Sequence, residues 1–296
     1  MKILFLLFVL ITALYCPVSG QGPKSNLVVP PEKRLPVVIP KFDVEPTIDG
    51  KLDEEIWKKA AVFRDFIQIQ PGDNIAASKQ TIAYVGYDEK NLYVGFHAYE
   101  DPNLLRATIA KRDDIFADDN VRVTLDTFND QRRAYVFFFN PFGIQADGIT
   151  EGQQGGGGQG GGQGGPDFSV DIVMESKGVL LDDGYSVEVK IPFKSLRYAA
   201  GKGQLWGFNV GRRIPRLNNE NDSWMPIARD VASLRQIGKI TGLDDIKTER
   251  TLEIVPSATL RQMARPAGSR RCAAPRLDNP SKHTERIYAR PLTAAR

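Results

Sequence analysis

Between Phe42 and Thr241 the chain is a succession of short segments in which apolar, β-branched or aromatic residues alternate with polar ones. Glycine, asparagine, aspartate and proline separate these segments. Alternation with a period of two places one face of a strand in a core, and turn residues at this spacing are typical of sandwiches and barrels. Because helical periodicity is scarce, we predict an all-β fold, a jelly-roll-like antiparallel β-sandwich of two sheets.

The clearest pair of strands is 82–87 and 92–99, which a polar turn joins as a hairpin. Two short helical turns are expected, at 53–59, where Asp53 can cap the first turn, and at 193–196 after a proline. Neither turn is long enough to define the fold. Further strands are predicted at residues 121–126, 134–140, 144–149, 168–175, 185–191, 205–212 and 237–241.

Residues 1–20 have the pattern of a secretion signal peptide. A lysine precedes a run of apolar residues, and small residues suited to a signal peptidase stand before Gln21. We expect cleavage after Gly20 and export to the periplasm, the outer membrane or the extracellular space, with no transmembrane helix left after cleavage. Cys16 leaves a lipid anchor as the alternative, although Tyr15 stands where a lipobox needs a small residue.

Composition divides the rest of the chain. Residues 21–41 are rich in proline and are predicted to be a linker, and residues 42–248 to be the sandwich. Residues 151–166 are almost all glycine and glutamine, which predicts a flexible loop between two strands. Residues 249–262 alternate like one more strand. The tail, 263–296, has no period, and we predict that it is disordered or out of frame.

Charge and residue types exclude several functions. The formal net charge of +3 comes from residues 263–296, which carry eight Lys or Arg against two acids. A nucleic-acid-binding domain carries its positive charge on the folded body, so nucleic acid is excluded as a partner. Residues 21–262 contain one histidine and no cysteine, which excludes Cys–His catalysis, a conventional zinc site and a disulfide framework. The sequence does not indicate an oligomeric state.

Four motifs resemble, in order and spacing, the family 9 carbohydrate-binding modules. They are Ile48–Trp57 (IDGKLDEEIW), Asn91–Val94 (NLYV), Asp118–Asp126 (DDNVRVTLD) and Tyr185–Pro192 (YSVEVKIP). The resemblance covers about residues 42–245. It implies a β-sandwich that binds a polysaccharide or oligosaccharide, is linked to polysaccharide catabolism by O-glycosyl hydrolases, and has no catalytic centre of its own.

Three further stretches, residues 191–198, 206–213 and 223–224, are similar to a narrower group of these proteins. In that group the module stands in front of an outer-membrane β-barrel of unknown function. The resemblance implies that residues 249–262 correspond to the strand leading into the barrel. We expect that the barrel is missing here, because even a small one needs eight strands.

Sugar binding needs flat aromatic faces for the apolar side of a pyranose ring and a few fixed polar groups for its hydroxyls. The resemblance implies an aromatic clamp of Phe116 and Trp224, although burial of Trp224 in the core is an equally weighted alternative. The family's aspartate falls on Asp119, which could instead bind backbone amides at the start of a strand. The family's sugar-contacting glutamate falls on Arg122, so that a donor replaces an acceptor. We therefore predict Phe116, Trp224, Arg122 and Asp119 as carbohydrate-binding residues.

No cofactor is required by this interpretation, but an acidic cluster could hold a structural calcium ion. Asp113, Asp114 and Asp118 offer the oxygen-only ligands that calcium prefers, and the resembled family includes calcium binders. Their spacing is not that of a recognised calcium loop. A solvated acidic loop is the alternative.

The leading hypothesis is therefore an exported carbohydrate-binding module. The alternative is a docking domain of a truncated outer-membrane barrel protein that binds no sugar and presents Arg122, Arg212, Arg213 and Arg216 as an anion-accepting surface. A hydrolase would need two carboxyl groups about 5–10 Å apart across a cleft. No pair of acids stands out in the sequence, so enzymatic activity is not expected.

Overall fold

The computed structural model of the protein describes residues 27–152, 165–199, 201–229 and 231–247. The chain divides into two units, Met1–Thr251 and Leu252–Arg296, of which the second lies outside the described residues. Within the described ranges, no helix has the length and apolar character needed to cross a membrane.

The described residues form two sheets, one of nine strands and one of five, which we call the large and the small sheet. In the large sheet β13 and β14 share one edge of β12, and β1 pairs with β14 in parallel. Its strands are, in spatial order, β4 (Ile75–Ala76), β3 (Ile67–Gln70), β13 (Glu220–Ser223), β12 (Trp206–Ile214), β7 (Asn120–Asp126), β8 (Arg133–Phe139) and β9 (Gln145–Glu151), with β14 (Gly238–Thr241) and β1 (Val37–Val38) beside them.

The small sheet is antiparallel throughout. Its strands are, in spatial order, β10 (Glu175–Leu181), β11 (Gly184–Pro192), β6 (Asn91–Tyr99), β5 (Thr81–Tyr87) and β2 (Ala61–Phe63). Four short 3₁₀ helices complete the described elements, η1 (Pro31–Lys33), η2 (Glu55–Lys59), η3 (Phe193–Ser195) and η4 (Ser233–Arg235).

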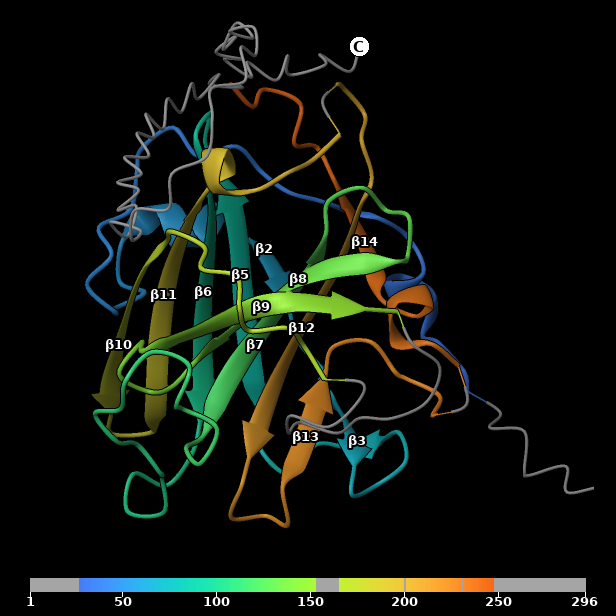
Figure 1. Cartoon of the computed structure of the whole chain (residues 1–296). Helices are drawn as coiled ribbons and strands as arrows, with labels where there is room; N and C mark the ends of the chain where they lie inside the picture. The colour runs from blue at the N-terminus through green and yellow to red at the C-terminus, as the bar shows by residue number, and fades with distance from the viewer. Residues whose placement is uncertain (1–26, 153–164, 200, 230, 248–296) are drawn as a thin grey trace, which may run out of the picture. The chain divides into compact units, whose positions relative to one another are not determined.

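The two sheets lie in separate layers, with β8 and β9 crossing β11 and β6 in Figure 1. Along β7, Val121, Val123 and Leu125 are fully buried and face the small sheet, where Val94 and Phe96 of β6 belong to the same core. Successive side chains of a strand point to opposite faces, so the residues between them face outward. The predicted two-sheet sandwich is confirmed.

Most strands were predictable from their alternation, but the strand expected at 168–175 is wrong. Strand β10 begins only at Glu175. In the preceding segment Phe168 packs in the apolar cluster on the outer face of the large sheet and Ile172 packs in the core between the sheets, and side chains satisfy its backbone. The Asp147 carboxylate accepts from the Ile172 amide at 2.6 Å, and the Arg112 guanidinium donates to the Ile172 carbonyl at 2.9 Å.

The N-terminal boundary of the sandwich also differs from the prediction. Within the segment expected to be a linker, Val37 and Val38 pair with Ile240 and Thr241, and Ile39 is 1% exposed in the core. A proline-rich composition prevents regular hydrogen bonding but does not prevent apolar residues between the prolines from joining a sheet edge. The sandwich therefore starts before Phe42.

Both expected helical turns are present as 3₁₀ helices, η2 and η3. At η2, however, the N-cap residue is Glu54 rather than Asp53, and no side chain caps the turn. The predicted signal peptide (1–20), the tail (263–296) and the strand at 249–262 lie outside the described residues, as does most of the 151–166 loop.

Two of the family-like motifs meet on the outer face of the small sheet. Glu188 of β11 points away from the core, and its carboxylate accepts from the Asp49 and Gly50 amides at 2.9 and 2.8 Å and from Trp57 Nε1 at 2.8 Å. Trp57 packs with Tyr93 in a satellite apolar cluster on that face. The segment 48–57 thus covers part of the outer face of the small sheet. The candidate site lies on the large sheet.

Candidate functional site

The outer face of the large sheet presents an arginine in the middle of three neighbouring strands. Arg122 of β7 stands opposite Phe138 of β8 on one side and Gly211 of β12 on the other. All three have the outward parity, because Val121 and Val123 on either side of Arg122 face the core. Arg122 is therefore flanked by an aromatic ring and by a residue without a side chain.

Gly211 makes the room in which the Arg122 guanidinium lies. A Cβ at position 211 would stand 2.8 Å from Arg122 Nη2 and 2.6 Å from the carbonyl oxygen of Asp222. Arg122 Nε is buried and has no hydrogen-bond partner among the described residues. Burial lowers the pKa of Arg122 to about 10, and the group stays charged at neutral pH.

A second arginine lies diagonally across the same pair of strands. Arg213 is two residues beyond Gly211 on β12, a separation that places diagonal neighbours about 7–8 Å apart on one face of a sheet. Its guanidinium donates to the Phe116 carbonyl at 2.7 Å and to Asn219 Oδ1 at 2.9 Å. Burial lowers the pKa of Arg213 as well. Arg213 thereby fastens the loop that carries Phe116.

Phe116 lies in that loop and packs onto the outer face. Its ring meets Phe138 edge-on with ring centroids 5.2 Å apart, and it lies 5.2 Å from Phe168. Phe116 remains partly exposed, whereas Phe138 beneath it is buried. Phe116 and Arg122 thus flank the same ring, and together they combine a partly open aromatic surface with a charged donor.

The predicted clamp between Phe116 and Trp224 does not form. Trp224 is 5% exposed, and its ring packs edge-on against Phe63 of the small sheet at 4.8 Å. It follows Ser223, which stands opposite Gly211 and faces outward, so alternation turns Trp224 inward. The sheet therefore separates Trp224 from Phe116, and the alternative of core burial is the correct one.

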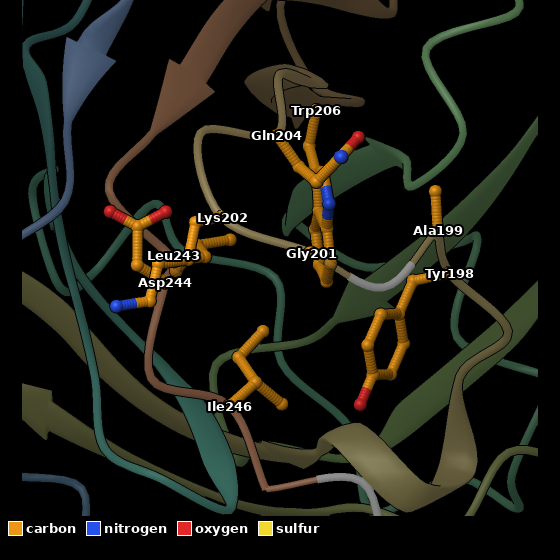
Figure 2. Close-up of a pocket in the computed structure, with 9 residues that line it drawn as sticks. All are labelled: Tyr198, Ala199, Gly201, Lys202, Gln204, Trp206, Leu243, Asp244 and Ile246. Carbon is orange, nitrogen blue, oxygen red and sulfur yellow. The ribbon is translucent and has the colours of Figure 1, made fainter.

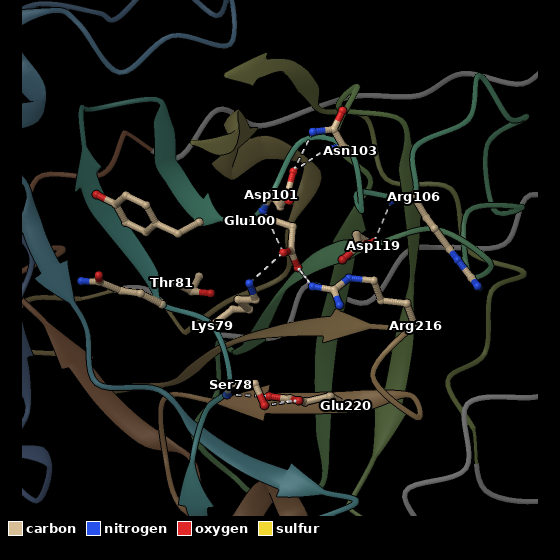
Figure 3. A network of polar contacts seen from close by, with 12 residues as sticks. Ser78, Lys79, Thr81, Glu100, Asp101, Asn103, Arg106, Asp119, Arg216 and Glu220 are labelled. Atoms are coloured by element: carbon tan, nitrogen blue, oxygen red, sulfur yellow. Dashed lines mark hydrogen bonds and ion pairs between the residues drawn. The ribbon is translucent and has the colours of Figure 1, made fainter. Parts of the chain in front are cut away.

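Asp119 also faces inward rather than toward a ligand. It is fully buried, and its Oδ2 accepts from the Arg106 amide at 3.0 Å, which fixes the backbone where β7 starts. Burial raises the pKa of Asp119. Nearby, the Glu100 carboxylate binds Lys79 at 3.0 Å and Arg216 at 2.6 Å (Figure 3). Asp119 is thus part of a buried polar group between the sheets.

The four arginines of the predicted anion-accepting surface do not lie together: two are beside Glu100, and two are on the outer face of the large sheet. Arg212 is 1% exposed, lies 5.5 Å from the Tyr185 ring and has its Nη2 3.8 Å from Glu100. Arg216 is paired with Glu100 as well. Only Arg122 and Arg213 share the outer face of the large sheet.

The three aspartates proposed as calcium ligands have separate roles. Asp118 Oδ2 accepts from the amide and hydroxyl of Thr108, both at 2.9 Å, and from Asn140 Nδ2 at 3.0 Å. Asp113 Oδ1 accepts from the Asp147 amide at 3.3 Å, and Asp114 is exposed. In the part of the chain that the structure describes, no three His, Cys, Asp or Glu side chains gather so as to hold a metal ion.

A cavity of about 230 Å³ offers a different candidate, between the loop after Tyr198 and the chain beyond β14 (Figure 2). It is smaller than the roughly 300–1,000 Å³ usual for ligand sites. Trp206 at its wall is 1% exposed, and Asp244 at its rim accepts from the Gly203 amide at 2.5 Å. Its lining comprises Tyr198, Ala199, Gly201, Lys202, Gln204, Trp206, Leu243, Asp244 and Ile246.

Comparison with known proteins identifies the sandwich. The family described as "Carbohydrate family 9 binding domain-like" matches residues 48–225, more than half of the chain. The protein belongs to this family. Phe116, Arg122 and Arg213 lie inside the matched region of the family 9 domain, whereas Leu243, Asp244 and Ile246 of the cavity lie outside it.

Solved structures share the fold of the family 9 domain. A family 9 module from Caldicellulosiruptor kristjanssonii, solved in complex with cellotriose, has 16% identity and a TM-score of 0.50, over 75% of this chain and 100% of that one. A protein from Bacteroides uniformis ATCC 8492 has 12% identity and a TM-score of 0.52, over 69% of this chain and 97% of that one. Among curated proteins, none matches the chain.

Sequence reasoning missed that Gly211 and Phe138 are part of this site. The signal was present in the run Trp206–Arg213, where glycine and asparagine alternate with apolar residues. Glycine at an outward position of a central strand marks a close approach by another group. That Arg122 is the group close to Gly211 could not be predicted without the register between β7 and β12.

Proposed function

We propose that the protein is a carbohydrate-binding module and that its ligand site is the outer face of the large sheet around Phe116 and Arg122. The single observation that carries the proposal is the family match over residues 48–225, which contains Phe116 and the strands β7, β8 and β12 on which Arg122, Phe138 and Arg213 stand. The aromatic and polar groups on the face support the same function, because sugar sites combine these two kinds of surface.

Each of the three side chains has a role in this proposal. The partly exposed Phe116 ring receives the apolar face of a pyranose ring, while Phe138 and Phe168 hold it in place. The Arg122 guanidinium donates hydrogen bonds to sugar oxygens, since it has no hydrogen-bond partner among the described residues. Arg213 positions the Phe116 loop through the Phe116 carbonyl.

We further infer that the protein is exported and works beside enzymes that degrade polysaccharides. Export is supported by the signal-peptide pattern of residues 1–20, and the link to degradation by the resemblance of the motifs. N-terminal sequencing of the protein recovered from the periplasm or medium should begin at Gln21. A mature chain that still begins at Met1 would contradict export by this route.

The sugar site is tested by calorimetric titration and thermal unfolding of the chain with cello- and xylo-oligosaccharides. A ligand that binds only the folded state raises Tm in proportion to ln(1 + [L]/Kd). The decisive variant is Phe116→Leu, which keeps an apolar side chain against Phe138 but removes the flat ring. We expect at least a tenfold rise in Kd, because one stacking contact is worth about 0.5–1.5 kcal/mol beyond burial and orientation is lost as well.

The matched control is Phe128→Leu. Phe128 is a phenylalanine 54% exposed in the turn after β7, away from the Phe116 ring cluster, and we expect an unchanged Kd. The proposal fails if neutral and charged glycans of every class leave Tm and the titration heat unchanged. It also fails at this face if Phe116→Leu binds as tightly as Phe128→Leu.

A further inference from the structure

Some described arginines pair with a carboxylate, but Arg122 and Arg213 on the outer face of the large sheet do not. Arg112 binds Asp147, and Arg216 binds Glu100. Arg122 forms no hydrogen bond or ion pair with any described residue, and Arg213 donates only to a carbonyl and an amide oxygen. Two positive charges therefore share one face without an acidic partner among the described residues.

Two positive charges on one face without acidic partners destabilise the folded protein unless a bound anion neutralises them. Removing a guanidinium from water without a partner is unfavourable, and leaving a buried donor unpaired adds a further penalty. The lowered pKa values of both arginines have burial as their cause and no opposing acid, which agrees with the geometry. Residues that are costly for the fold and gathered on one surface are candidates for a ligand site.

The N–H donors of the two arginines indicate which kind of ligand would pair with them. A guanidinium presents N–H groups in a planar fork that matches a carboxylate or a sulfate. Gly211 leaves open the space over β12 in which the Arg122 fork lies, and Arg213 stands on the diagonal position of the same face. Phe116 beside them supplies an apolar surface that a small inorganic ion does not use.

We propose that the sugar bound at this face carries an anionic group, the carboxylate of a uronic acid or a sulfate ester, and that Arg122 pairs with it. The inference rests on the proposed sugar-binding function and names the class of sugar. Arg213 adds positive potential and orients the loop. Acidic polysaccharides are then the preferred ligands over neutral glucans and xylans.

The test compares ligands that share a galactose-type backbone and differ in whether they carry a carboxylate, a sulfate ester or no acidic group. Calorimetric titrations of the full chain at fixed, low ionic strength use a galactose tetramer, the corresponding tetra-galacturonate and a sulfated galactose tetramer, with inorganic sulfate as the simple anion. We expect one of the two acidic oligosaccharides to bind at least tenfold more tightly than the neutral one. The preference should shrink as salt is raised, because the pairing is electrostatic.

The residue assignment is tested with Arg122→Gln, which keeps hydrogen-bonding capacity but removes the charge. It should weaken the acidic ligand at least tenfold, a larger factor than the loss for the neutral one. Arg132→Gln, in an exposed turn position, is the matched control and should change neither. Arg213→Gln provides a second variant, and the ligand comparison on the unaltered chain holds even if Arg122→Gln fails to fold.

The outcomes separate the two proposals. Neutral oligosaccharides that bind as tightly as acidic ones overturn the charge preference and leave the sugar-binding function standing. Inorganic sulfate that binds as tightly as the acidic sugars overturns the role of the sugar ring. An acidic preference that Arg122→Gln and Arg213→Gln leave intact overturns the assignment to this face. If no sugar of any class binds, both the function and the inference fail.

Discussion

At the scale of single residues, the candidate site depends on a small residue as much as on a large one. Gly211 lies between the carbonyl oxygen of Asp222 and the guanidinium of Arg122, and a Cβ there would be too close to both. Arg122 can lie across β12 only because position 211 has no side chain. The glycine is therefore part of the site without touching a ligand itself.

This predicts that Gly211→Ala destabilises the domain and displaces Arg122. The added methyl group cannot be accommodated by a flexible side chain alone, because one of its neighbours is a backbone oxygen. Overpacking of this kind costs about 1–3 kcal/mol. In a domain of this size Tm falls by about 2–4 °C per kcal/mol, which differential scanning calorimetry measures.

A double-mutant cycle separates the contact of the added methyl group with Arg122 from its contact with the Asp222 carbonyl oxygen. The variant Arg122→Ala/Gly211→Ala should lose less stability than the sum of the two single changes, because the side-chain part of the overlap has been removed. Independent sites add within about 0.3–0.5 kcal/mol. Additivity within that range would show that the guanidinium does not lie over Gly211.

At the scale of elements, a motif near the start of the domain is tied to a strand more than a hundred residues later. Glu188 of β11 receives three N–H groups from the segment 48–57, and Gly50 adopts φ +93°, a conformation that favours glycine. The segment cannot pair as a strand with the outer face of a sheet, so a carboxylate satisfies its amides instead. The two motifs are thus two halves of one contact.

Glu188→Gln should therefore loosen this segment. A glutamine offers one acceptor oxygen where the carboxylate offers two, and its NH₂ group would face at least one of the three donors. The unpaired buried donor costs about 1–3 kcal/mol, which urea denaturation measures. Glu175→Gln on β10, where the carboxylate is 65% exposed, is the control, and an equal loss in both variants would refute the role of Glu188.

Strands were predictable because alternation is local, and contacts between elements were not. The hairpin of β5 and β6 follows from polar turn residues between two apolar runs, and it is present as expected. The failure at 168–175 has a specific reason, since Asp147 and Arg112 bind the Ile172 backbone there in place of a neighbouring strand. Side chains from distant segments decide such cases, and a single sequence does not reveal them.

The site was predictable in part for the same reason. Phe116 and Arg122 were found because the family resemblance places its aromatic residue three positions before Asp119 and its polar residue three positions after it, and the structure brings both beside Phe138. Trp224 and Asp119 were assigned to the site although both face inward. Which face a residue takes depends on where each strand begins, and a shift of one residue reverses it.

At the scale of the whole molecule, the sandwich encloses charged groups between its sheets. Arg212 of β12 faces Asp222 of β13 in register, and its guanidinium donates to the Tyr99 carbonyl at 2.9 Å. Glu220 lies nearby, and its carboxylate binds Ser78 rather than a cation. Asp222 is fully buried, and neither of its oxygens has a hydrogen-bond partner among the described residues. Global stability should therefore depend on its ionisation.

Burial, with the neighbouring Glu220 carboxylate, raises the pKa of Asp222 to about 8, against the opposing effect of Arg212. In the unfolded chain an aspartate has a pKa of about 3.9. Between these values the unfolded state releases a proton that the folded state retains, so stability falls as pH rises from about 4 to about 8. The limiting slope for one such group is about 1.4 kcal/mol per pH unit.

Asp222→Asn removes this dependence while keeping the shape of the protonated side chain. Relative to the unaltered protein, the unfolding free energy of the variant should be higher at pH 8 than at pH 5 by at least about 1 kcal/mol. Urea denaturation at the two pH values measures it. Burial also raises the pKa of Glu188 to about 7, but that contribution is common to both proteins and cancels in the difference. Asp171→Asn, with a side chain 84% exposed, is the control and should show no such change. An equal difference at both pH values for Asp222→Asn would mean that Asp222 is already ionised at pH 5, and that Arg212 neutralises it within the sandwich.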